Sequence, residues 1–302
     1  MLFHRRAFRS GRRGRAPGGG PSSHTRTRAS SSPQAGNAAR GPSGVLPGGG
    51  APAPPRMSAV SDAPDPPPGS SPEARWAHGR VQSALAAGPP ERVVGVMVAS
   101  VDFRAAVAGR SGGLSSEADR ELLRAWRAAS DLLLVGARTL EQERYGALVT
   151  PAQSASRVAA GRPPVPPIVT LSRGFDLDLD QVLGYDEQLD VTVYTEADVT
   201  APAGRPSVGV VRLARLTAAA AIAHARREAG ATRILCEGGP TLLARVAQSG
   251  LLTDLSLTVS PLLVGHGPVV LADFEAGEPR RLALHDVHRD GDFVFLHHRV
   301  SG

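Results

Sequence analysis

Residues 234–240 read Ile-Leu-Cys-Glu-Gly-Gly-Pro, and this septet decides the fold. An apolar, β-prone run ends in the carboxylate of Glu237, then come two glycines and Pro240, and Thr241-Leu242-Leu243 follow. Glycine permits close backbone approach and proline suits the first helical turn, so the septet predicts a strand that turns sharply into a helix. Free amide N–H groups at such a helix start attract anions. We therefore expect phosphate binding here, with a purely structural turn, which needs only one glycine, as the alternative.

Strand-like and helix-like segments alternate on either side of the septet. Strands are expected at Val93–Ala99, Asp131–Val135, Ile168–Leu171, Val191–Tyr194, Arg233–Cys236 and Leu255–Val259, and helices after the N-cap Ser116, over Thr217–Ala229 and over Thr241–Gln248. The unbroken apolar run at Val93–Ala99 is typical of a strand buried on both faces, whereas Leu255–Val259 alternates with one polar face. This alternation predicts an α/β domain with a largely parallel sheet. The β-rich C-terminal residues, ending in Phe293–Leu296, predict antiparallel strands added at one edge.

Charge separates the N-terminal part of the chain from the rest. All 34 basic residues are arginine, and ten of them precede Met57 in a stretch without Asp or Glu. The whole chain has a formal net charge of +6, whereas the residues from Met57 onward carry 24 arginines against 28 acidic residues, a net charge of −4. The expected folded part therefore lacks the basic excess of a nucleic-acid-binding domain, and no nucleic-acid partner is expected.

Residues 1–90 are rich in Gly, Pro, Ser, Ala and Arg. Such a composition cannot offset the entropy of ordering, so we expect residues 1–90 to be disordered and residues 91–302 to form the functional domain. The tail could be an organellar transit peptide, a nucleic-acid-binding arm, or an over-long reading frame whose true start is Met57. Its proline and glycine density disfavours a targeting helix, and the arginine-only usage favours the third interpretation.

Neither a membrane segment nor a metal site is expected. No stretch approaches the roughly 20 apolar residues of a membrane span, so a cytoplasmic location and no membrane partner are expected. The single cysteine, Cys236, excludes an intramolecular disulfide and a cysteine-cluster metal site, and we expect it to be a small core residue. Four histidines lie close in sequence, His285, His288, His297 and His298, but the last two face opposite sides of a strand, which suits no metal ion.

Glycines, hydroxyls, carboxylates and arginines follow four of the expected strands. They are Ser100-Val101-Asp102 with the loop Gly109–Leu114, then Gly136–Thr139 with Glu143 and Tyr145, then Ser172-Arg173, and finally Glu237-Gly238-Gly239. In open α/β sheets, ligands bind outside the carboxyl ends of the strands. One ligand site is therefore expected at this edge of the sheet.

Together these segments resemble the pyrimidine reductase family of riboflavin biosynthesis, the reductase half of the bacterial deaminase-reductase. The resemblance runs from about Val93 to Leu271 and is carried in order by Ser100-Val101-Asp102, Gly109–Leu114, Leu133–Thr139, Cys236–Leu243 and Leu262–Gly267. It implies a dihydrofolate-reductase-like fold, which is a mixed, mostly parallel sheet flanked by helices, and a homodimer. It also implies NADPH-dependent reduction of 5-amino-6-(5-phosphoribosylamino)uracil to its ribityl form.

The resemblance further implies a role for individual residues. Contacts with NADPH are implied for Val98, Gly113, Thr139, Glu143, Ser172, Arg173, Gly238, Gly239, Pro240, Thr241, Leu242, Leu243 and Arg245. Contacts with the substrate are implied for Ser111, Arg127, Tyr145, Leu148 and Glu237. Arg173, beside Ser172, is expected to meet the adenosine 2′-phosphate, because a guanidinium fork suits a phosphate. Arg127 could instead be a helix-surface residue in line with Arg120 and Arg124.

Two departures from the family pattern bear on activity. Phe103 follows Asp102 where the family usually has glycine, so this strand end is altered. The His-x-Glu and Pro-Cys-x-x-Cys motifs of the deaminase half do not occur, which implies a stand-alone reductase. For catalysis we expect Asp102 to donate the proton, with water as an equally compatible source, and Glu237 to hold the pyrimidine ring. The alternatives are a reductase of another imine, carbonyl or pterin, and a non-catalytic nucleotide-binding protein.

Overall fold

The computed structural model describes residues 66–143, 145–184, 186, 189–205, 207–275 and 277–300. Its helices are α1 (Pro72–Ala86), α2 (Glu117–Ala129), α3 (Ala137–Gln142), α4 (Pro151–Ala159), α5 (Leu179–Leu183), α6 (Ala218–Ala229) and α7 (Pro240–Gln248). Its strands are β1 (Arg92–Ala99), β2 (Leu132–Gly136), β3 (Ile168–Leu171), β4 (Val191–Thr195), β5 (Val208–Arg212), β6 (Arg233–Cys236), β7 (Asp254–Val259), β8 (Leu282–Asp290) and β9 (Phe293–Val300).

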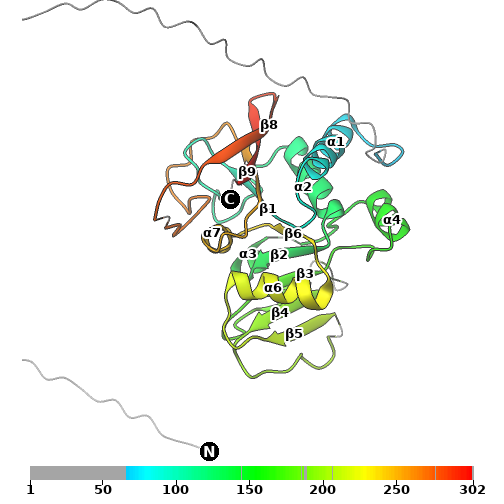
Figure 1. Ribbon diagram of the computed structural model, residues 1–302, viewed down its shortest axis with the longest axis vertical. Helices are drawn as coiled ribbons and strands as arrows, with labels where there is room; N and C mark the ends of the chain where they lie inside the picture. Colours follow the sequence, from blue (N-terminus) through cyan, green and yellow to red (C-terminus); the bar gives the residue numbers. More distant parts are fainter. Residues whose placement is uncertain are drawn as a thin grey trace, which may run out of the picture. The chain divides into compact units, whose positions relative to one another are not determined.

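All nine strands form one sheet in the order β5-β4-β3-β2-β6-β1-β7-β9-β8 (Figure 1). The strands from β5 to β7 pair in parallel, and β9 pairs antiparallel with both β7 and β8. The predicted mixed, mostly parallel sheet flanked by helices is therefore confirmed, and so is the antiparallel addition at one edge. Because β1, β2 and β6 are parallel neighbours, their carboxyl ends open at the same edge of the sheet.

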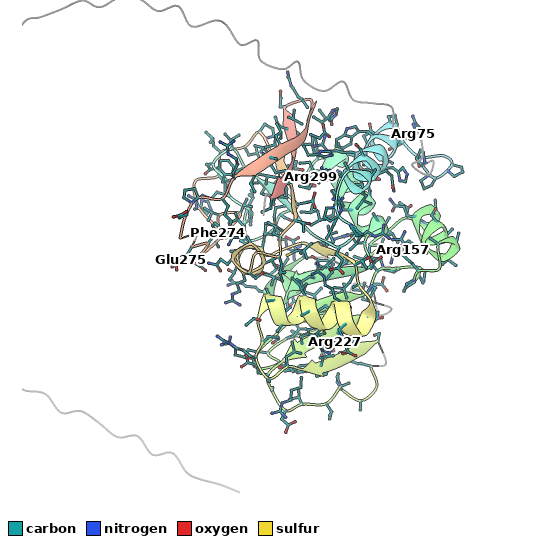
Figure 2. The ribbon with its side chains drawn as sticks, viewed as in Figure 1. Arg75, Arg157, Arg227, Phe274, Glu275 and Arg299 are labelled. Carbon is teal, nitrogen blue, oxygen red and sulfur yellow. The ribbon has the colours of Figure 1, made fainter. Side chains whose placement is uncertain are left out.

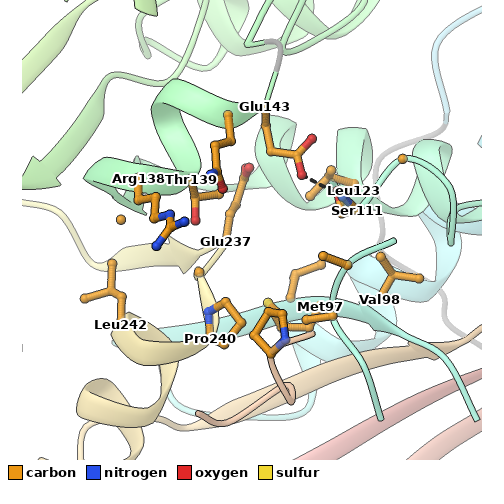
Figure 3. A pocket seen from close by; sticks show the side chains of 18 of the residues that line it. Met97, Val98, Ser111, Leu123, Arg138, Thr139, Glu143, Glu237, Pro240 and Leu242 are labelled. Atoms are coloured by element: carbon orange, nitrogen blue, oxygen red, sulfur yellow. Dashed lines mark hydrogen bonds between the residues drawn. The ribbon is translucent and has the colours of Figure 1, made fainter. Parts of the chain in front are cut away.

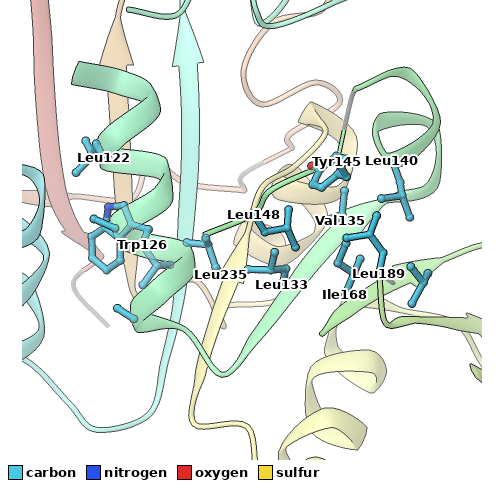
Figure 4. Close-up of a cluster of buried hydrophobic side chains, with 14 of the residues drawn as sticks. Leu122, Trp126, Leu133, Val135, Leu140, Tyr145, Leu148, Ile168, Leu189 and Leu235 are labelled. Carbon is cyan, nitrogen blue, oxygen red and sulfur yellow. The ribbon is translucent and has the colours of Figure 1, made fainter. Parts of the chain in front are cut away.

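Each central strand sends its side chains into two separate clusters. In β2, Leu133 and Val135 pack in a cluster with α1 and α2, which Figure 4 shows from close by. Leu132 and Leu134 pack on the opposite face, in a cluster with α6 and α7. All four of these side chains are at most 4% exposed. Helices therefore cover both faces of the parallel strands, as the unbroken apolar runs of the sequence indicate.

Helix α1 corrects the predicted extent of disorder. It lies within residues 1–90, yet Ala77, Val81 and Ala84 are each at most 1% exposed and pack in the cluster of β1 and α2. The prediction of disorder is wrong for residues 72–86, because one face of this helix completes the core. Ser71 caps the helix by accepting a hydrogen bond from the amide of Ala74. The prediction for residues 1–65 lies outside the described residues.

Gly79 allows a direct test of α1. It is exposed, and a β-carbon built there meets no other atom within 4 Å. Because glycine costs about 0.5–1 kcal/mol relative to alanine inside a helix, Gly79→Ala should raise the free energy of unfolding by that amount. Gly69→Ala is the matched control: it also has open space, but its φ of +79° should make alanine destabilising. Urea titration of both variants checks this, and a neutral or destabilising Gly79→Ala would contradict a stable α1.

Strand β7 has the polar face that its alternating sequence predicts, and this face is covered. The hydroxyl residues Ser256 and Thr258 are both 2% exposed, so the polar face of this strand is buried, not solvated. The Thr258 hydroxyl on this face contacts the Asp119 carboxylate of α2, so a helix covers it. The described part of the chain has no helix long and apolar enough to cross a membrane.

Candidate active site

A cavity, called the main cavity below, opens where β1, β2 and β6 end. It has a volume of about 780 Å³, and its wall combines the end of β1, the turns into α3 and α7, and one face of α2. Figure 3 shows Arg138 and Thr139 of α3 on one side, and Leu242 and Pro240 of α7 with Met97 of β1 along the other. A site at this edge of the sheet is what the strand-end residues predict.

The turn from β6 into α7 has the geometry expected from the septet. Gly238 has φ of +80°, a backbone conformation that favours glycine, and its carbonyl accepts a 2.7 Å hydrogen bond from the amide of Gly136. Gly239 is the N-cap of α7 and has no side-chain cap, while Pro240 occupies the first helical turn. A β-carbon on Gly239 would stand 2.5 Å from the Thr139 hydroxyl oxygen. The turn therefore presents an uncapped helix start in a space that only glycine leaves open.

Glu237 is the centre of a buried polar network. Its two carboxylate oxygens accept hydrogen bonds from Nε and Nη2 of Arg127, both at 2.7 Å, and the Tyr145 hydroxyl donates a third at 3.0 Å. The side chains of Glu237 and Arg127 are only 5% and 13% exposed. Burial and the nearby carboxylate raise the pKa of Tyr145, and the same carboxylate outweighs burial and raises the pKa of Arg127. All three residues line the main cavity, and Arg127 is not the helix-surface residue of the alternative interpretation.

Arg157 of α4 fixes the end of α2 that carries Arg127. Its guanidinium donates hydrogen bonds to the carbonyls of Ala128 and Ser130, at 2.9 and 2.6 Å, and to that of Pro163 at 2.9 Å. These carbonyls at the end of α2 are otherwise left without helical partners. Arg157 is 1% exposed, and Figure 2 labels it beside α4. The orientation of Arg127 thus depends on a second arginine outside the cavity wall.

The glycine loop before α2 is attached to the same wall. Glu143 accepts a 2.7 Å hydrogen bond from the backbone amide of Ser111, which Figure 3 shows as a dashed line. Both residues line the main cavity, together with Gly112 of the same loop. A carboxylate that holds a loop amide is a positioning contact, so Glu143 orders the loop beside the cavity.

Most of the predicted site residues come together in this cavity. Those on its wall are Val98, Ser111, Arg127, Thr139, Glu143, Tyr145, Glu237, Gly239, Pro240, Thr241, Leu242 and Arg245. Those that do not line it are Asp102, Gly113, Leu148, Ser172, Arg173, Gly238 and Leu243. Leu148 and Leu243 are 2% and 0% exposed and belong to the two apolar clusters, so their side chains support the site from behind.

The structure does not support the expectation that Asp102 donates the proton. Its carboxylate accepts hydrogen bonds from the Ser100 hydroxyl at 2.6 Å and from the amides of Val264 and Gly265 at 3.0 and 2.7 Å. These bonds, that of Ser100 foremost, lower the pKa of Asp102, so the carboxyl is ionised and holds no proton to donate. Asp102 instead joins two loops, and the adjacent Phe103 adopts φ of +58°, the left-handed conformation for which the family's glycine is suited.

A second cavity of about 600 Å³ adjoins the main one. Leu171 and Arg245 line both, and the second also contains Arg173 and the start of α6 at Thr217. The Arg173 side chain is 72% exposed, with its Nε 3.6 Å from Glu196. Arg173 therefore lies outside the main cavity but at a cavity that continues from it.

Several residues of the main cavity wall were missed by sequence reasoning. They include Met97, Asp119, Arg120, Leu123 and Gln142. A signal existed for two of them, since Asp119, Leu123 and Arg127 are spaced four residues apart and so share one face of α2. Cys236 is not among them; burial raises its pKa to about 12, which keeps it a thiol in the core, as expected.

The strand order, the flanking helices and the cavity at the strand ends define an α/β protein of the dihydrofolate-reductase-like class. Residues 92–295 match the family described as the RibD C-terminal domain. The chain belongs to this family, the pyrimidine reductase family of riboflavin biosynthesis, whose members are oxidoreductases. No curated protein sequence matches the chain.

Solved structures share the fold at low sequence identity. A pyrimidine reductase-like protein of Corynebacterium diphtheriae is 20% identical, with a TM-score of 0.61 over 73% of this chain and 99% of that one. RibD of Acinetobacter baumannii is 22% identical, with a TM-score of 0.55 over 72% of this chain and 60% of that one. A deaminase/5-amino-6-(5-phosphoribosylamino)uracil reductase of Thermotoga maritima is 20% identical, with a TM-score of 0.56 over 70% of this chain and 57% of its own length. This chain thus spans less than two thirds of the latter two.

Proposed function

We propose that this protein reduces 5-amino-6-(5-phosphoribosylamino)uracil to its ribityl form, using NADPH as the hydride donor. The observation that carries the proposal is the main cavity, where an uncapped helix start and the Glu237–Arg127–Tyr145 network share one wall. Family membership supplies the reaction class, and the reductase from Thermotoga maritima carries this substrate in its name. A reductase of another imine, carbonyl or pterin, or a non-catalytic homologue, is the outcome if the pyrimidine is not reduced.

The chain offers the groups that a dinucleotide requires. The amides at the uncapped start of α7 suit the pyrophosphate, because helix N-termini favour anions. Arg138 and Arg245 add positive charge on the same wall. The absence of a β-carbon at Gly239 keeps this surface open, since such an atom would already crowd Thr139. These features fit NADPH, which when bound supplies the hydride for the reduction.

The part of the wall around Glu237 suits the polar pyrimidine. Glu237 keeps a fixed orientation because Arg127 donates a hydrogen bond to each of its carboxylate oxygens and Tyr145 donates one more. A carboxylate oxygen has more than one lone pair, so Glu237 can also accept a bond from a ring N–H of the substrate. Arg120, also on the wall, offers a cation to a substrate phosphate. Ser111 adds a hydroxyl from the loop, and Glu143 already fixes the Ser111 backbone by accepting a hydrogen bond from its amide.

We further propose that the enzyme works as a cytoplasmic homodimer on a small-molecule substrate. The net charge of −4 from Met57 onward supports small-molecule partners over nucleic acid.

NADPH fluorescence quenching with and without the pyrimidine substrate tests the proposal. We expect NADPH to bind the free protein and to be oxidised only after the pyrimidine is added. Binding without oxidation would support the non-catalytic alternative, and oxidation with a pterin but not with the pyrimidine would support another substrate.

Arg173→Ala tests the cofactor choice. If Arg173 contacts the 2′-phosphate, NADPH should lose about 10- to 150-fold in affinity, from about 1.5–3 kcal/mol for a charged hydrogen bond, while NADH binding stays unchanged. The fold should tolerate the change, because the Arg173 backbone carbonyl, not its guanidinium, accepts the bonds from Thr195 and Glu196. Titration with both cofactors decides: an equal loss for NADH and NADPH would assign Arg173 to the fold.

A further inference from the structure

Asp119 is a buried carboxyl group on the wall of the main cavity. It lies in the first turn of α2 and is 8% exposed, while its neighbours Leu123 and Arg127 follow at four-residue spacing on the same cavity-facing side. As expected, Ser116 caps α2 by accepting from the Asp119 amide. The carboxylate itself accepts a hydrogen bond from the Ser115 hydroxyl and contacts the buried Thr258 hydroxyl of β7. The sequence pattern of a helix cap therefore conceals a side chain that belongs to the cavity.

The surroundings of Asp119 favour its protonated form. Burial raises the pKa of Asp119, and the bonds from Ser115 and Thr258 and the charge of Arg120 oppose this without cancelling it. The start of α2 also favours the carboxylate, but a helix terminus contributes only about 0.3–1 kcal/mol, less than one pKa unit. The other charged or titratable groups on the described cavity wall are Arg138, Glu143, Tyr145, Arg245 and the Arg127–Glu237 pair. Arg127 neutralises Glu237, so this ion pair adds no net charge to the wall that Asp119 shares.

We propose that Asp119 is the proton donor of the reduction, a role that rests on the proposed function and that Asp102 cannot fill. The open-chain imine of the substrate receives a hydride at the sugar C1 from the dihydronicotinamide and a proton at nitrogen from the Asp119 carboxyl. The C=N double bond becomes a single bond, a C–H and an N–H bond form, and the O–H bond of Asp119 breaks. Bound NADPH would supply the two electrons of this hydride and become NADP⁺, and solvent water would return a proton to the Asp119 carboxylate.

Asp119→Asn tests this role, because asparagine keeps the volume and a hydrogen bond with Ser115 but cannot donate a proton in catalysis. We expect kcat to fall by about 10²- to 10⁴-fold, the usual contribution of a general acid, with NADPH affinity and melting temperature unchanged. In the wild type, kcat should fall as the pH rises through the Asp119 pKa, since the acid form is then lost; this limb should be absent in the variant. Glu117→Gln, an exposed position in the same helical turn, is the matched control and should change neither.

Infrared difference spectroscopy of wild type against Asp119→Asn gives a readout independent of turnover. The carbonyl band of a protonated carboxyl should be present in the wild type and should titrate well above the ordinary Asp pKa of about 3.9, at the midpoint of the kcat limb. Ser115→Ala covers the case in which Asp119→Asn fails to fold. It removes a bond that lowers the Asp119 pKa, so both midpoints should move to higher pH.

Three results overturn the proposal. The first is a kcat of Asp119→Asn within a few-fold of wild type, and the second is an unchanged fall of kcat at high pH in that variant. The third is that Ser115→Ala moves neither the midpoint of the kcat profile nor that of the infrared titration. Each would exclude Asp119 as the donor and leave the proposed function intact. Absence of NADPH oxidation in the wild type itself would defeat both, so the two failures can be told apart.

Discussion

Glu237→Gln is expected to lower kcat/KM by about 30- to 150-fold. The change keeps the volume but replaces an anionic acceptor with a neutral amide, and a hydrogen bond to a charged group contributes about 2–3 kcal/mol. The loss should be large because Glu237 is 5% exposed in its side chain and bonded to both Arg127 and Tyr145, so no water can substitute for it. Steady-state kinetics with the pyrimidine substrate measures the effect, and Glu228→Gln, which changes an exposed glutamate, is the control.

NADPH affinity should barely move in Glu237→Gln, because we assign this carboxylate to the substrate. The variant should also lower the melting temperature, since breaking a buried ion pair leaves the Arg127 charge uncompensated. The double variant Arg127→Gln, Glu237→Gln should recover part of that stability and none of the activity. Should Glu237→Gln weaken NADPH as much as a change at Gly239 does, the division between substrate and cofactor walls is wrong.

Gly239→Val is expected to abolish NADPH binding in a protein that remains folded. A β-carbon at this position stands 2.5 Å from the Thr139 hydroxyl oxygen, so the Thr139 side chain, α3 or the start of α7 must shift, and the larger valine side chain adds to the crowding. The amides at the start of α7 then no longer face the pyrophosphate, and their favourable geometry is lost. Fluorescence titration with NADPH measures the loss, and circular dichroism verifies that α7 and the remaining fold are retained.

Thr139→Ala separates the two reasons for such a loss. It removes the atom that the new β-carbon would meet inside the protein, so the pair Gly239→Ala and Thr139→Ala relieves the internal crowding. If the double variant still binds NADPH far more weakly than Thr139→Ala alone, the β-carbon obstructs the ligand itself. Binding restored to the level of Thr139→Ala would instead show that Gly239 only spaces α3 from α7, in contradiction to the assigned contact with the cofactor.

The elements that the sequence predicts well are those with strong local signals. The unbroken apolar run Val93–Ala99 is enough to predict β1. The Glu-Gly-Gly-Pro turn is enough to predict the junction between β6 and α7, because its glycines and proline suit that turn. Helix α1 was missed since the average composition of residues 1–90 concealed its local pattern. Ser71 before Pro72 is a helix-start signal, and Ala77, Val81 and Ala84 have helical spacing, but these small residues give a weak apolar face.

The site depends on contacts that no local pattern contains. Arg127 and Glu237 are 110 positions apart, and only the packing of α2 against β6 brings them together. The hydrogen bonds that keep Asp102 ionised could not be foreseen from the sequence. Their donors, the amides of Val264 and Gly265, come from a loop more than 160 positions away. The family resemblance implies ligand contacts for Leu148 and Leu243, yet their side chains face the core, a direction that the resemblance alone cannot specify.

Deuterium transfer tests the proposed reaction most directly. The full chain is incubated with NADPH deuterated at C4 of the nicotinamide and with 5-amino-6-(5-phosphoribosylamino)uracil, and the product is examined by NMR and mass spectrometry. Because only one of the two C4 hydrogens is transferred, both C4 positions of the NADPH carry deuterium. We predict one deuterium per molecule of product, at C1 of the new ribityl chain, with one NADP⁺ formed for each. Unlabelled product, or no product despite bound NADPH, would contradict the assignment of this cavity as a pyrimidine reductase site.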